Sequence, residues 1–253
     1  LNSIFEVPYS SSLLNFQSAL AQQCFINEYI YDQSDGENTL LGELEKSIVE
    51  TLHKGKQPPP QSILCLASYK PLYKYNWCNL LKTSEDTDEV LMMQITEPQK
   101  EAQIKLGIPT FGIIKDLVSS SVKEQYEESP YPRWVNAALA LKPIRISQLI
   151  DNVDLKIFDH KIKQVKNPNI LVAGCGTGQH SIETACRFKN SKVIAIDLSK
   201  ASLAYAVRKT TDLKLQNIEY KQADILNLNK MDKKFDIIES AGVLHHMNKP
   251  KEG

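Results

Sequence analysis

The second half of the chain carries a glycine cluster whose spacing can do chemistry. Gly174, Gly176 and Gly178 fall within five positions, directly behind the apolar run Ile-Leu-Val-Ala. Glycine loses more conformational freedom on folding than any other residue, so this cluster indicates either a tight turn or a backbone that approaches a ligand. Asp197 follows 19 residues after the last glycine, where a carboxylate can accept both hydroxyls of a ribose. The spacing therefore favours a nucleoside-containing ligand.

The order of these glycines separates two kinds of nucleoside site. A dinucleotide fingerprint has the order G-x-G-x-x-G, and Gln179 occupies the position of its third glycine. The chain has G-x-G-x-G instead. An NAD-dependent dehydrogenase is therefore a less favoured alternative.

Three titratable residues follow the last apolar run and are candidates for acid–base chemistry: Glu239, His245 and His246. A histidine there can take a proton from an incoming nucleophile, because its unperturbed pKa lies near neutrality. The alternative is a helix start in which one histidine packs and the other is solvated. The two histidines are adjacent rather than four residues apart, so no metal site is expected.

The elements that must position these residues alternate from residue 169 onward. Short β-branched runs alternate with helical stretches, which predicts βαβ units and a parallel sheet covered by helices. The glycines then lie at a strand-to-helix turn, where open α/β sheets bind ligands. The fold class is α/β, with a Rossmann-like parallel sheet of about four strands, expected in "NILVA", "KVIAID", "IEYKQAD" and "FDIIES".

The first half of the chain is predicted to be mainly helical. Leu13, Phe16, Leu20 and Cys24 step by three or four residues, and Leu41, Leu44, Ile48 and Leu52 repeat the pattern. Thr96 is a plausible N-cap of a later helix, and Val118, Val122 and Tyr126 share a face of another. The expected domains are a helical domain over 1–129, a linker with cofactor-covering helices over 130–168, and the Rossmann-like domain over 169–253.

Composition excludes several classes of partner. The 253 residues hold 30 Lys and Arg and 30 Asp and Glu, so the formal net charge is zero and no broad nucleic-acid surface is expected. The chain has no apolar run of about 18 residues or more, which argues against a membrane partner. The five cysteines are scattered, which is typical of reduced thiols in a cytoplasmic protein.

Four segments in order resemble the class I S-adenosylmethionine-dependent methyltransferases: "ILVAGCGTG", "VIAIDLS", "YKQADILNL" and "FDIIESAGVLHHM". The resemblance implies a methyltransferase with S-adenosyl-L-methionine as cofactor. It places the glycine loop at the methionine and ribose side, Asp197 at the ribose, and Asp224 at the adenine amino group. The remaining residues implied at the cofactor are Cys175, Thr177, Gln179, Leu198, Ala223, Ile225, Ser240 and Ala241.

One position departs from this family. Many members have an acidic residue two positions before the first glycine, where this chain has Val172, so the cofactor ammonium would need another partner. A narrower resemblance, carried by "QYEESPYPRW", is to bacterial methyltransferases that often carry tetratricopeptide repeats, although no 34-residue repeat is present. It implies that Tyr131 and Arg133 cover the cofactor, with Arg133 pairing with its carboxylate. The alternative is a packed turn anchored by Trp134.

The chain stops a few residues past the fourth motif, so we expect a sheet that lacks the family's later strands, in a truncated chain. The edge of "FDIIES" would then be open, which invites a homodimer through strand pairing. The methyl acceptor, a small molecule or a protein side chain, is not identified by the sequence. A cofactor-binding or regulatory module without catalysis is the alternative from a different class.

Overall fold

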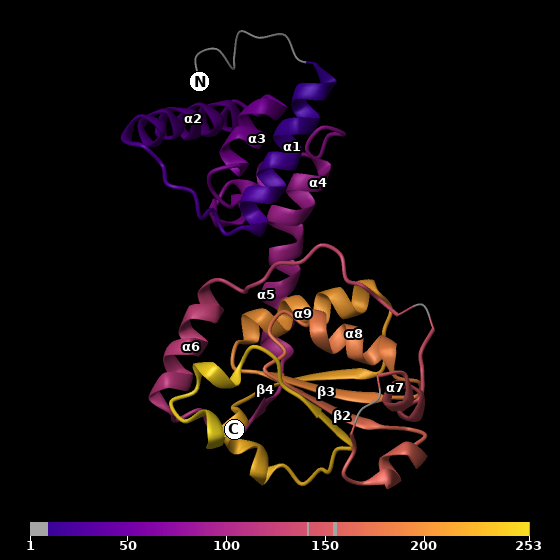
Figure 1. Ribbon diagram of the computed structural model, residues 1–253. Helices are drawn as coiled ribbons and strands as arrows, with labels where there is room; N and C mark the ends of the chain where they lie inside the picture. The colour runs from indigo at the N-terminus through magenta and orange to yellow at the C-terminus, as the bar shows by residue number, and fades with distance from the viewer. Residues whose placement is uncertain (1–9, 141, 154–155, 253) are drawn as a thin grey trace. The chain divides into compact units, whose positions relative to one another are not determined.

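The chain forms two compact units, residues 1–100 and 101–253, in a computed structural model that describes residues 10–140, 142–153 and 156–252 (Figure 1). The first nine residues of the expected helical domain lie outside this description. The expected boundary at 129 differs from the observed one at 100. Residues 101–129 belong with the sheet, because Thr110–Phe111 joins it as a strand and a helix over Leu117–Glu128 packs beside it.

The first unit is helical, as predicted. In α2 (Asp35–His53), the predicted stripe Leu41, Leu44, Ile48 and Leu52 is buried. The predicted stripe of α1 (Ser11–Ile26) is right only in part: Cys24 and Phe25 are buried as expected, but Phe16 and Leu20 are exposed, and Leu14 and Ala21 are buried instead. Apolar residues lie on two adjacent faces of α1, so spacing alone did not decide which face packs. The other helices of this unit are α3 (Pro60–Ala67), η2 (Leu72–Lys74), η3 (Cys78–Leu80), α4 (Asp88–Leu91) and η4 (Met92–Thr96), and α5 (Glu97–Gly107) begins in this unit and continues past residue 100 into the second.

The expected helix start at Thr96 is also wrong. Thr96 ends η4, a π-helical stretch that joins α4 directly to α5. This wide turn lies just before Pro98, which has no N–H to donate to the helix. Pro98, near the predicted helix start, therefore marks the change from π-helix to α-helix within one longer helix.

Gln94, in this π-helical stretch, is a buried polar side chain that joins three segments of the first unit. Its amide donates to the carbonyls of Ala21 and Ala67 at 3.1 and 2.9 Å, and its Oε1 accepts from the N–H of Leu72 at 3.2 Å. Its exposed fraction is zero. Buried polar groups left without a partner are costly, so this side chain holds the helices in one arrangement.

We predict that Gln94→Leu lowers the free energy of unfolding of the first unit by about 2–4 kcal/mol, because it leaves buried backbone groups unpaired. Urea unfolding followed by tryptophan fluorescence measures this, since Trp77 lies in the first unit. The matched control is Gln23→Leu on an exposed position of α1. Equal stability of the two variants would contradict the prediction.

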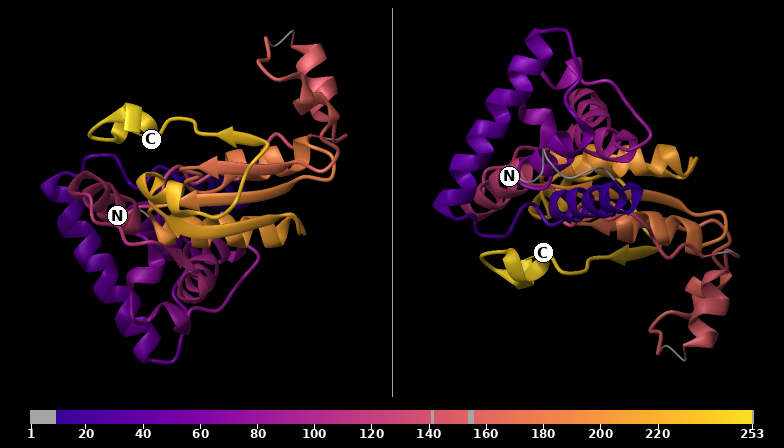
Figure 2. Two further views of the ribbon diagram at one scale, coloured as in Figure 1. Left: turned by 90° about the horizontal axis from the view of Figure 1, so that it is seen from below. Right: turned by 90° about the horizontal axis from the view of Figure 1, so that it is seen from above.

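The second unit is built on a parallel sheet of five strands in the order β1-β4-β3-β2-β5 (Figures 1 and 2). The four expected strands are present as β2 (Asn169–Ala173), β3 (Lys192–Asp197), β4 (Ile218–Ala223) and β5 (Ile237–Glu239). Two helices connect them as predicted, α8 (Gln179–Arg187) and α9 (Lys200–Asp212). The α/β fold with a mainly helical N-terminal region is therefore confirmed.

The side chains of the central strands alternate between the two faces of the sheet. Ile170, Val172, Val193 and Ala195 pack with α8 and α9, which lie over one face in Figure 1. The side chains of the opposite face pack with residues of η6 (Ile225–Lys230) and with Phe111 and Phe235, and they are Leu171, Ala173, Ile194, Ile196 and Ala223. Both faces of the central strands are covered, as expected for a parallel sheet.

The two edge strands were not equally predictable. β1 (Thr110–Phe111) pairs with β4 and was not predicted, because two residues carry too little pattern to be read as a strand. β5 pairs with β2 and is the edge strand on the other side, marked by the yellow arrow in Figure 2. Its Ile238 is exposed. Pairing of this edge with a second copy stays a prediction.

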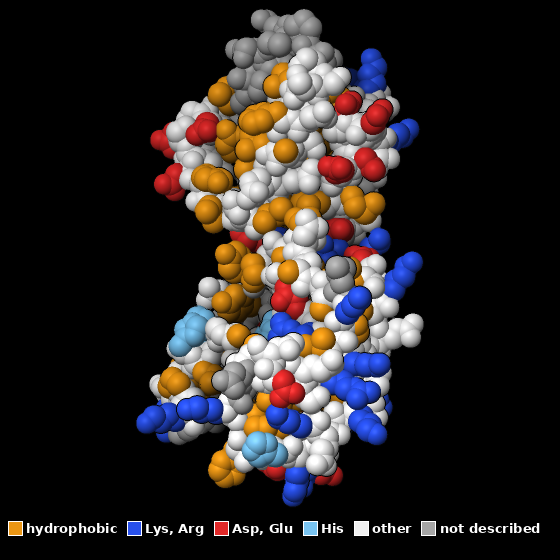
Figure 3. Space-filling model, turned by 45° about the vertical axis from the view of Figure 1, so that its right-hand side comes forward, with side chains coloured by type: hydrophobic (Ala, Val, Ile, Leu, Met, Phe, Trp, Pro, Cys, Tyr) orange, Lys and Arg blue, Asp and Glu red, His pale blue; other side chains and the backbone are white. Residues whose placement is uncertain are grey.

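Two further features concern the surface and the cysteines. Although the formal net charge is zero, Lys and Arg side chains gather on part of the visible face of the second unit (Figure 3). No described helix is long and apolar enough to cross a membrane. All five cysteines are free thiols. The remaining elements of the second unit are α7 (Ile146–Asn152), η5 (His160–Gln164), η7 (Leu244–His246) and η8 (Pro250–Glu252).

Candidate functional site

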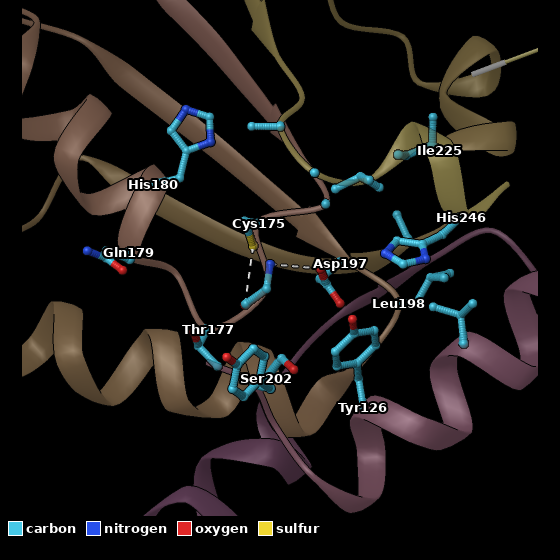
Figure 4. Close-up of a pocket in the computed structure, with 18 of the residues that line it drawn as sticks. Tyr126, Cys175, Thr177, Gln179, His180, Asp197, Leu198, Ser202, Ile225 and His246 are labelled. Carbon is cyan, nitrogen blue, oxygen red and sulfur yellow. Dashed lines mark hydrogen bonds between the residues drawn. The ribbon is translucent and has the colours of Figure 1, made fainter. Parts of the chain in front are cut away.

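A cavity of about 460 Å³ lies at the carboxyl ends of the parallel strands in the second unit. Its walls come from the loops after β2, β3, β4 and β5 and from α6 (Leu117–Glu128). Figure 4 shows His180 and Gln179 on one side and Leu198, Ile225 and His246 on the other, with Asp197 between them. The predicted site residues that line it are Tyr131, Gly174, Cys175, Gly176, Thr177, Gln179, Asp197, Leu198, Ala223, Asp224, Ile225, Ala241 and His246.

The three glycines of the loop after β2 all have positive φ, but they differ in what they face. A Cβ on Gly174 would overlap Val243, at 2.4 Å from Cγ2, whereas one on Gly176 would meet only the carbonyl of Tyr131 at 3.9 Å. Gly178 does not line the cavity. A Cβ there would lie 2.5 Å from that of Ala206 in α9, so this glycine lets two helices approach. The structure thus gives Gly178 a packing role, and its expected contact with the cofactor stays a prediction.

Asp197 lies at the tip of β3 and faces the loop. Its Oδ2 accepts from the N–H of Gly176 at 2.8 Å, and its Oδ1 accepts from the N–H of Ser199 at 3.0 Å. Burial raises the pKa of this carboxyl, and the hydrogen bonds from backbone N–H groups only partly oppose that rise. The carboxylate is thus held in place beside the cavity, where it can accept hydroxyl donors from a ligand.

Asp224 follows β4 and forms the next part of the wall. It is buried, with 4% exposure, and its Oδ1 accepts from the N–H of Leu226 at 3.0 Å. Ala223 and Ile225 flank it, and Leu198 comes from the loop after β3. An acceptor between apolar side chains suits a flat ring with an amino group.

Helix α6 supplies a wall that the sequence analysis did not assign to the site. Ser119, Val122 and Tyr126 line the cavity, and Tyr126 lies close to Asp197 and Leu198 in Figure 4. Ser199 Oγ donates to the carbonyl of Tyr126 at 2.9 Å, which joins α6 to the start of α9. The signal was present, because these residues step by three and four and share one helix face.

The segment before the sheet is fixed to the glycine loop by two hydrogen bonds. Trp134 Nε1 donates to the carbonyl of Thr177 at 3.1 Å, and Thr177 Oγ1 donates to the carbonyl of Pro132 at 2.6 Å. Trp134 is buried against Tyr205 of α9 at a ring distance of 6.0 Å. Tyr131 and Pro132 thereby reach the cavity wall. Trp134 is the anchor that the alternative interpretation of this segment expected.

Arg133 does not line the cavity, and its expected contact with a cofactor carboxylate stays a prediction. Its side chain is buried with 9% exposure, and its Nη1 lies 4.0 Å from Glu101 Oε2. The same carboxylate accepts from Arg208 Nε at 2.8 Å, and Arg208 also pairs with Asp212. The guanidinium thus faces a buried acidic partner within its own unit. A buried Arg pairs readily with such a carboxylate, and the sequence does not reveal which carboxylate is close.

The catalytic candidates are placed differently from one another. His246 lines the cavity, whereas His245 does not; the two rings are tilted by 41° to each other, with their centroids 4.1 Å apart. Glu239 and the exposed Ser240 also lie outside the lining. Glu239 instead lies 3.0 Å from Nε2 of His180, which does line the cavity. Glu239 and His245 therefore lie outside the cavity wall, and their catalytic roles stay predictions.

His180 is the functional candidate that sequence reasoning missed. It stands in the first turn of α8, directly after the glycine loop, so its position next to that loop was the available signal. Its partner Glu239 is 59 positions away at the end of β5, and the two meet because β2 and β5 are neighbours in the sheet. Order along the chain does not reveal that adjacency.

We predict that Trp134→Phe weakens both the fold and ligand binding, because a six-membered ring remains but the pyrrole part of the indole and its hydrogen bond to Thr177 are lost. The free energy of unfolding should fall by about 1–2 kcal/mol. The affinity for S-adenosylhomocysteine, measured by calorimetric titration, should fall severalfold, since the loop loses a tether. Val135→Ala, at an exposed neighbour, is the control. If Trp134→Phe left both the free energy of unfolding and the affinity unchanged, the proposed role of the Trp134–Thr177 hydrogen bond would be contradicted.

The site thus has a glycine loop, a buried carboxylate at the end of β3 and an acidic residue among apolar side chains, at the carboxyl edge of a Rossmann-like sheet. That combination is typical of nucleoside-binding α/β domains. Residues 170–252 match a protein-family model described as a methyltransferase domain. This part of the chain is therefore similar to methyltransferase domains, and the cofactor of the S-adenosylmethionine-dependent methyltransferases is S-adenosyl-L-methionine.

Individual relatives are similar over parts of the chain. An uncharacterised protein of Rickettsia prowazekii (strain Madrid E) is 26% identical over 133 residues, which cover 53% of this chain and 50% of that protein. Malonyl-[acyl-carrier protein] O-methyltransferase 1 of Ilyobacter polytropus is 41% identical over 86 residues, covering 34% and 30%. PKMT2 from Rickettsia typhi, solved in complex with AdoHcy, is 29% identical, covering 34% and 17%, with a TM-score of 0.32. The chain spans half or less of the length of these proteins.

Proposed function

We propose that this chain binds S-adenosyl-L-methionine in the cavity and transfers its methyl group to an acceptor with a nucleophilic atom. The observation that carries the proposal is that the loop after β2, Asp197 at the end of β3 and Asp224 after β4 line one cavity. In this proposal Asp197 accepts the ribose hydroxyls and Asp224 accepts the adenine amino group. The methionyl end lies toward the glycine loop.

The residues present fit such a cofactor in size and in polarity. A cavity of about 460 Å³ lies within the roughly 300–1,000 Å³ of small-molecule sites. Ser202 Oγ is buried beside the cavity and has no hydrogen-bond partner among the described residues, so a ligand group can satisfy it. Gly176 leaves space above its backbone toward the cavity. These are features of a site for a polar nucleoside.

The cofactor, when bound, supplies an electrophilic methyl group on a sulfonium. The protein's part is to hold the acceptor in line and to exclude water, since positioning and desolvation supply much of the acceleration in such a transfer. The apolar wall from Val122, Leu198, Ile225 and Val243 supports that exclusion. The acceptor would approach on the side of α8 and the segment after β5, where the titratable side chains are.

The experiment is calorimetric titration of the chain with S-adenosylhomocysteine and, separately, with NAD. Binding of the first alone supports the proposal, and binding of NAD alone would replace it with the dehydrogenase alternative. The chain is then incubated with methyl-labelled S-adenosylmethionine and a cell extract. Label transfer to an extract component supports an enzyme, whereas tight binding without transfer favours a binding or regulatory module.

A further inference from the structure

The imidazole of His180 is oriented by a carboxylate that stands outside the cavity. His180 lines the cavity from the first turn of α8, and its Nε2 lies 3.0 Å from Oε2 of Glu239 at the end of β5. The carboxylate accepts the Nε2–H, which leaves Nδ1 as the nitrogen with a free lone pair. Two different elements therefore set the tautomer and the orientation of one ring.

Glu239 is held ionised for this task. Burial raises the pKa of its carboxyl, but hydrogen bonds from His180 and Thr184 outweigh burial, so the pKa lies below its usual range. Thr184 Oγ1, one turn along α8, donates to the same Oε2 at 2.5 Å. A carboxylate fixed by two donors is a rigid partner for the imidazole.

Other charged or titratable groups face this pair from the elements around it. Glu183 on α8 lines the same side and accepts from Gln179 Nε2 at 3.3 Å. Arg187, also on α8, acts on Glu239 through its charge. The groups lining the cavity from the other elements are Asp197, Asp224, His246, Tyr126, Tyr131 and Cys175. No Lys or Arg is among the described lining residues, so an anionic acceptor finds no counter-charge there.

We propose that His180, positioned by Glu239, takes the proton from the methyl acceptor, and that this acceptor is a neutral or cationic molecule with an N–H or O–H nucleophile. This inference rests on the proposed function of the same site. His180 is the catalytic residue and Glu239 is a positioning residue. Proteins usually orient a histidine base in this way, with the imidazole facing the substrate and a carboxylate hydrogen-bonded to the other ring nitrogen.

The step balances within these groups. The acceptor's lone pair forms the new bond to the methyl carbon, while the electron pair of the broken carbon–sulfur bond stays on sulfur. The proton that the acceptor's nitrogen or oxygen loses goes to Nδ1 of His180, and Glu239 stabilises the resulting imidazolium. Solvent then removes this proton after the product leaves.

The test uses two probes with the full chain. S-adenosylhomocysteine is uncharged at its sulfur, and sinefungin carries an ammonium group where the cofactor carries its methylsulfonium. If His180 faces that position, the neutral imidazole tolerates the ammonium and the imidazolium repels it. The ratio of the two dissociation constants should therefore move about tenfold in favour of sinefungin as the pH rises and the imidazole loses its proton.

Three variants make the result specific. In His180→Gln the ratio should be independent of pH, whereas in His160→Gln, at an exposed histidine on η5, it should move as in the wild type. In Glu239→Gln the NMR titration of His180, identified by its loss in His180→Gln, should shift to lower pH, because an opposite charge has been removed. Circular dichroism confirms that each variant is folded.

The possible outcomes distinguish the proposed binding of the cofactor from the proposed roles of His180 and Glu239. If neither probe binds the wild type, the proposed function fails. If S-adenosylhomocysteine binds but the ratio moves with pH equally in wild type and His180→Gln, the role of His180 is overturned while cofactor binding stands. If the His180 titration is the same in Glu239→Gln, the positioning role of Glu239 is overturned.

Discussion

Asp197→Ala is expected to raise the dissociation constant for S-adenosylhomocysteine by about 100-fold or more. Two hydrogen bonds from ribose hydroxyls to a carboxylate are each worth about 1.5–3 kcal/mol, and every 1.4 kcal/mol is tenfold in affinity. The substitution also frees the N–H of Gly176, which Asp197 Oδ2 accepts at 2.8 Å. The loop then loses the contact that fixes its backbone next to the ligand.

The pH dependence of binding gives this prediction a second measurement. Only the ionised carboxylate accepts from both hydroxyls, so affinity falls as pH drops through the pKa of Asp197. Burial raises that pKa, so the loss begins at a higher pH than it would for an ordinary aspartate. Titrations from about pH 7 to about pH 4 should show this fall in the wild type. The curve for Asp197→Ala should be flatter.

Asp232→Ala is the matched control, because Asp232 is exposed and outside the cavity. It should bind S-adenosylhomocysteine like the wild type. Thermal unfolding of both variants separates lost binding from lost folding. If a folded Asp197→Ala variant bound S-adenosylhomocysteine as tightly as the wild type, the ribose would not lie at Asp197. The proposed orientation of the cofactor would then be wrong.

The strands and helices of the second unit were predictable because each carries a local pattern. "KVIAID" corresponds to β3 (Lys192–Asp197) without an error at either end, since its run is apolar, β-branched and bounded by polar residues. β1 was not predictable, because its two residues are a strand only by pairing with β4. A short edge strand forms because it pairs with the neighbouring strand, and its own residues carry no strand pattern.

The candidate site follows the same rule. Asp197 and Asp224 line the cavity because each is the last residue of a predicted strand, and the carboxyl ends of parallel strands share one edge. His180 and Glu239 meet only because β5 lies beside β2, and nothing local in the sequence encodes that contact. Arg133 is the opposite case, in which the residue type indicated a carboxylate partner but not which one. An arginine is suited to bind a carboxylate, and the carboxylate beside its guanidinium belongs to Glu101 of the protein itself.

The glycine motif predicted that Gly178 contacts the cofactor. Its surroundings in the structure give a separate reason for a glycine at this position. It precedes α8 with φ of +88°, and its Cα faces α9. A Cβ would lie 2.5 Å from Cβ of Ala206, 3.0 Å from its Cα and 3.3 Å from the hydroxyl of Tyr220. None of these can retreat easily, because Ala206 is fully buried and Tyr220 is nearly so.

Gly178→Ala is therefore expected to lower the free energy of unfolding by about 3 kcal/mol or more, from left-handed backbone strain and overpacking together. Gly176→Ala is the contrast, because it carries similar backbone strain at φ of +52° but meets only one atom, at 3.9 Å, and should lose about 1 kcal/mol. Urea unfolding measures both.

Adding Ala206→Gly to Gly178→Ala removes the atom that the new Cβ would strike. This double variant should recover part of the loss, although glycine within α9 itself costs about 1 kcal/mol. A double-mutant cycle isolates the contact, because the coupling between two touching sites is typically about 0.5–3 kcal/mol. A coupling of zero would show that α8 and α9 are not in contact at Gly178, and the glycine would then owe its place to the ligand side of the loop.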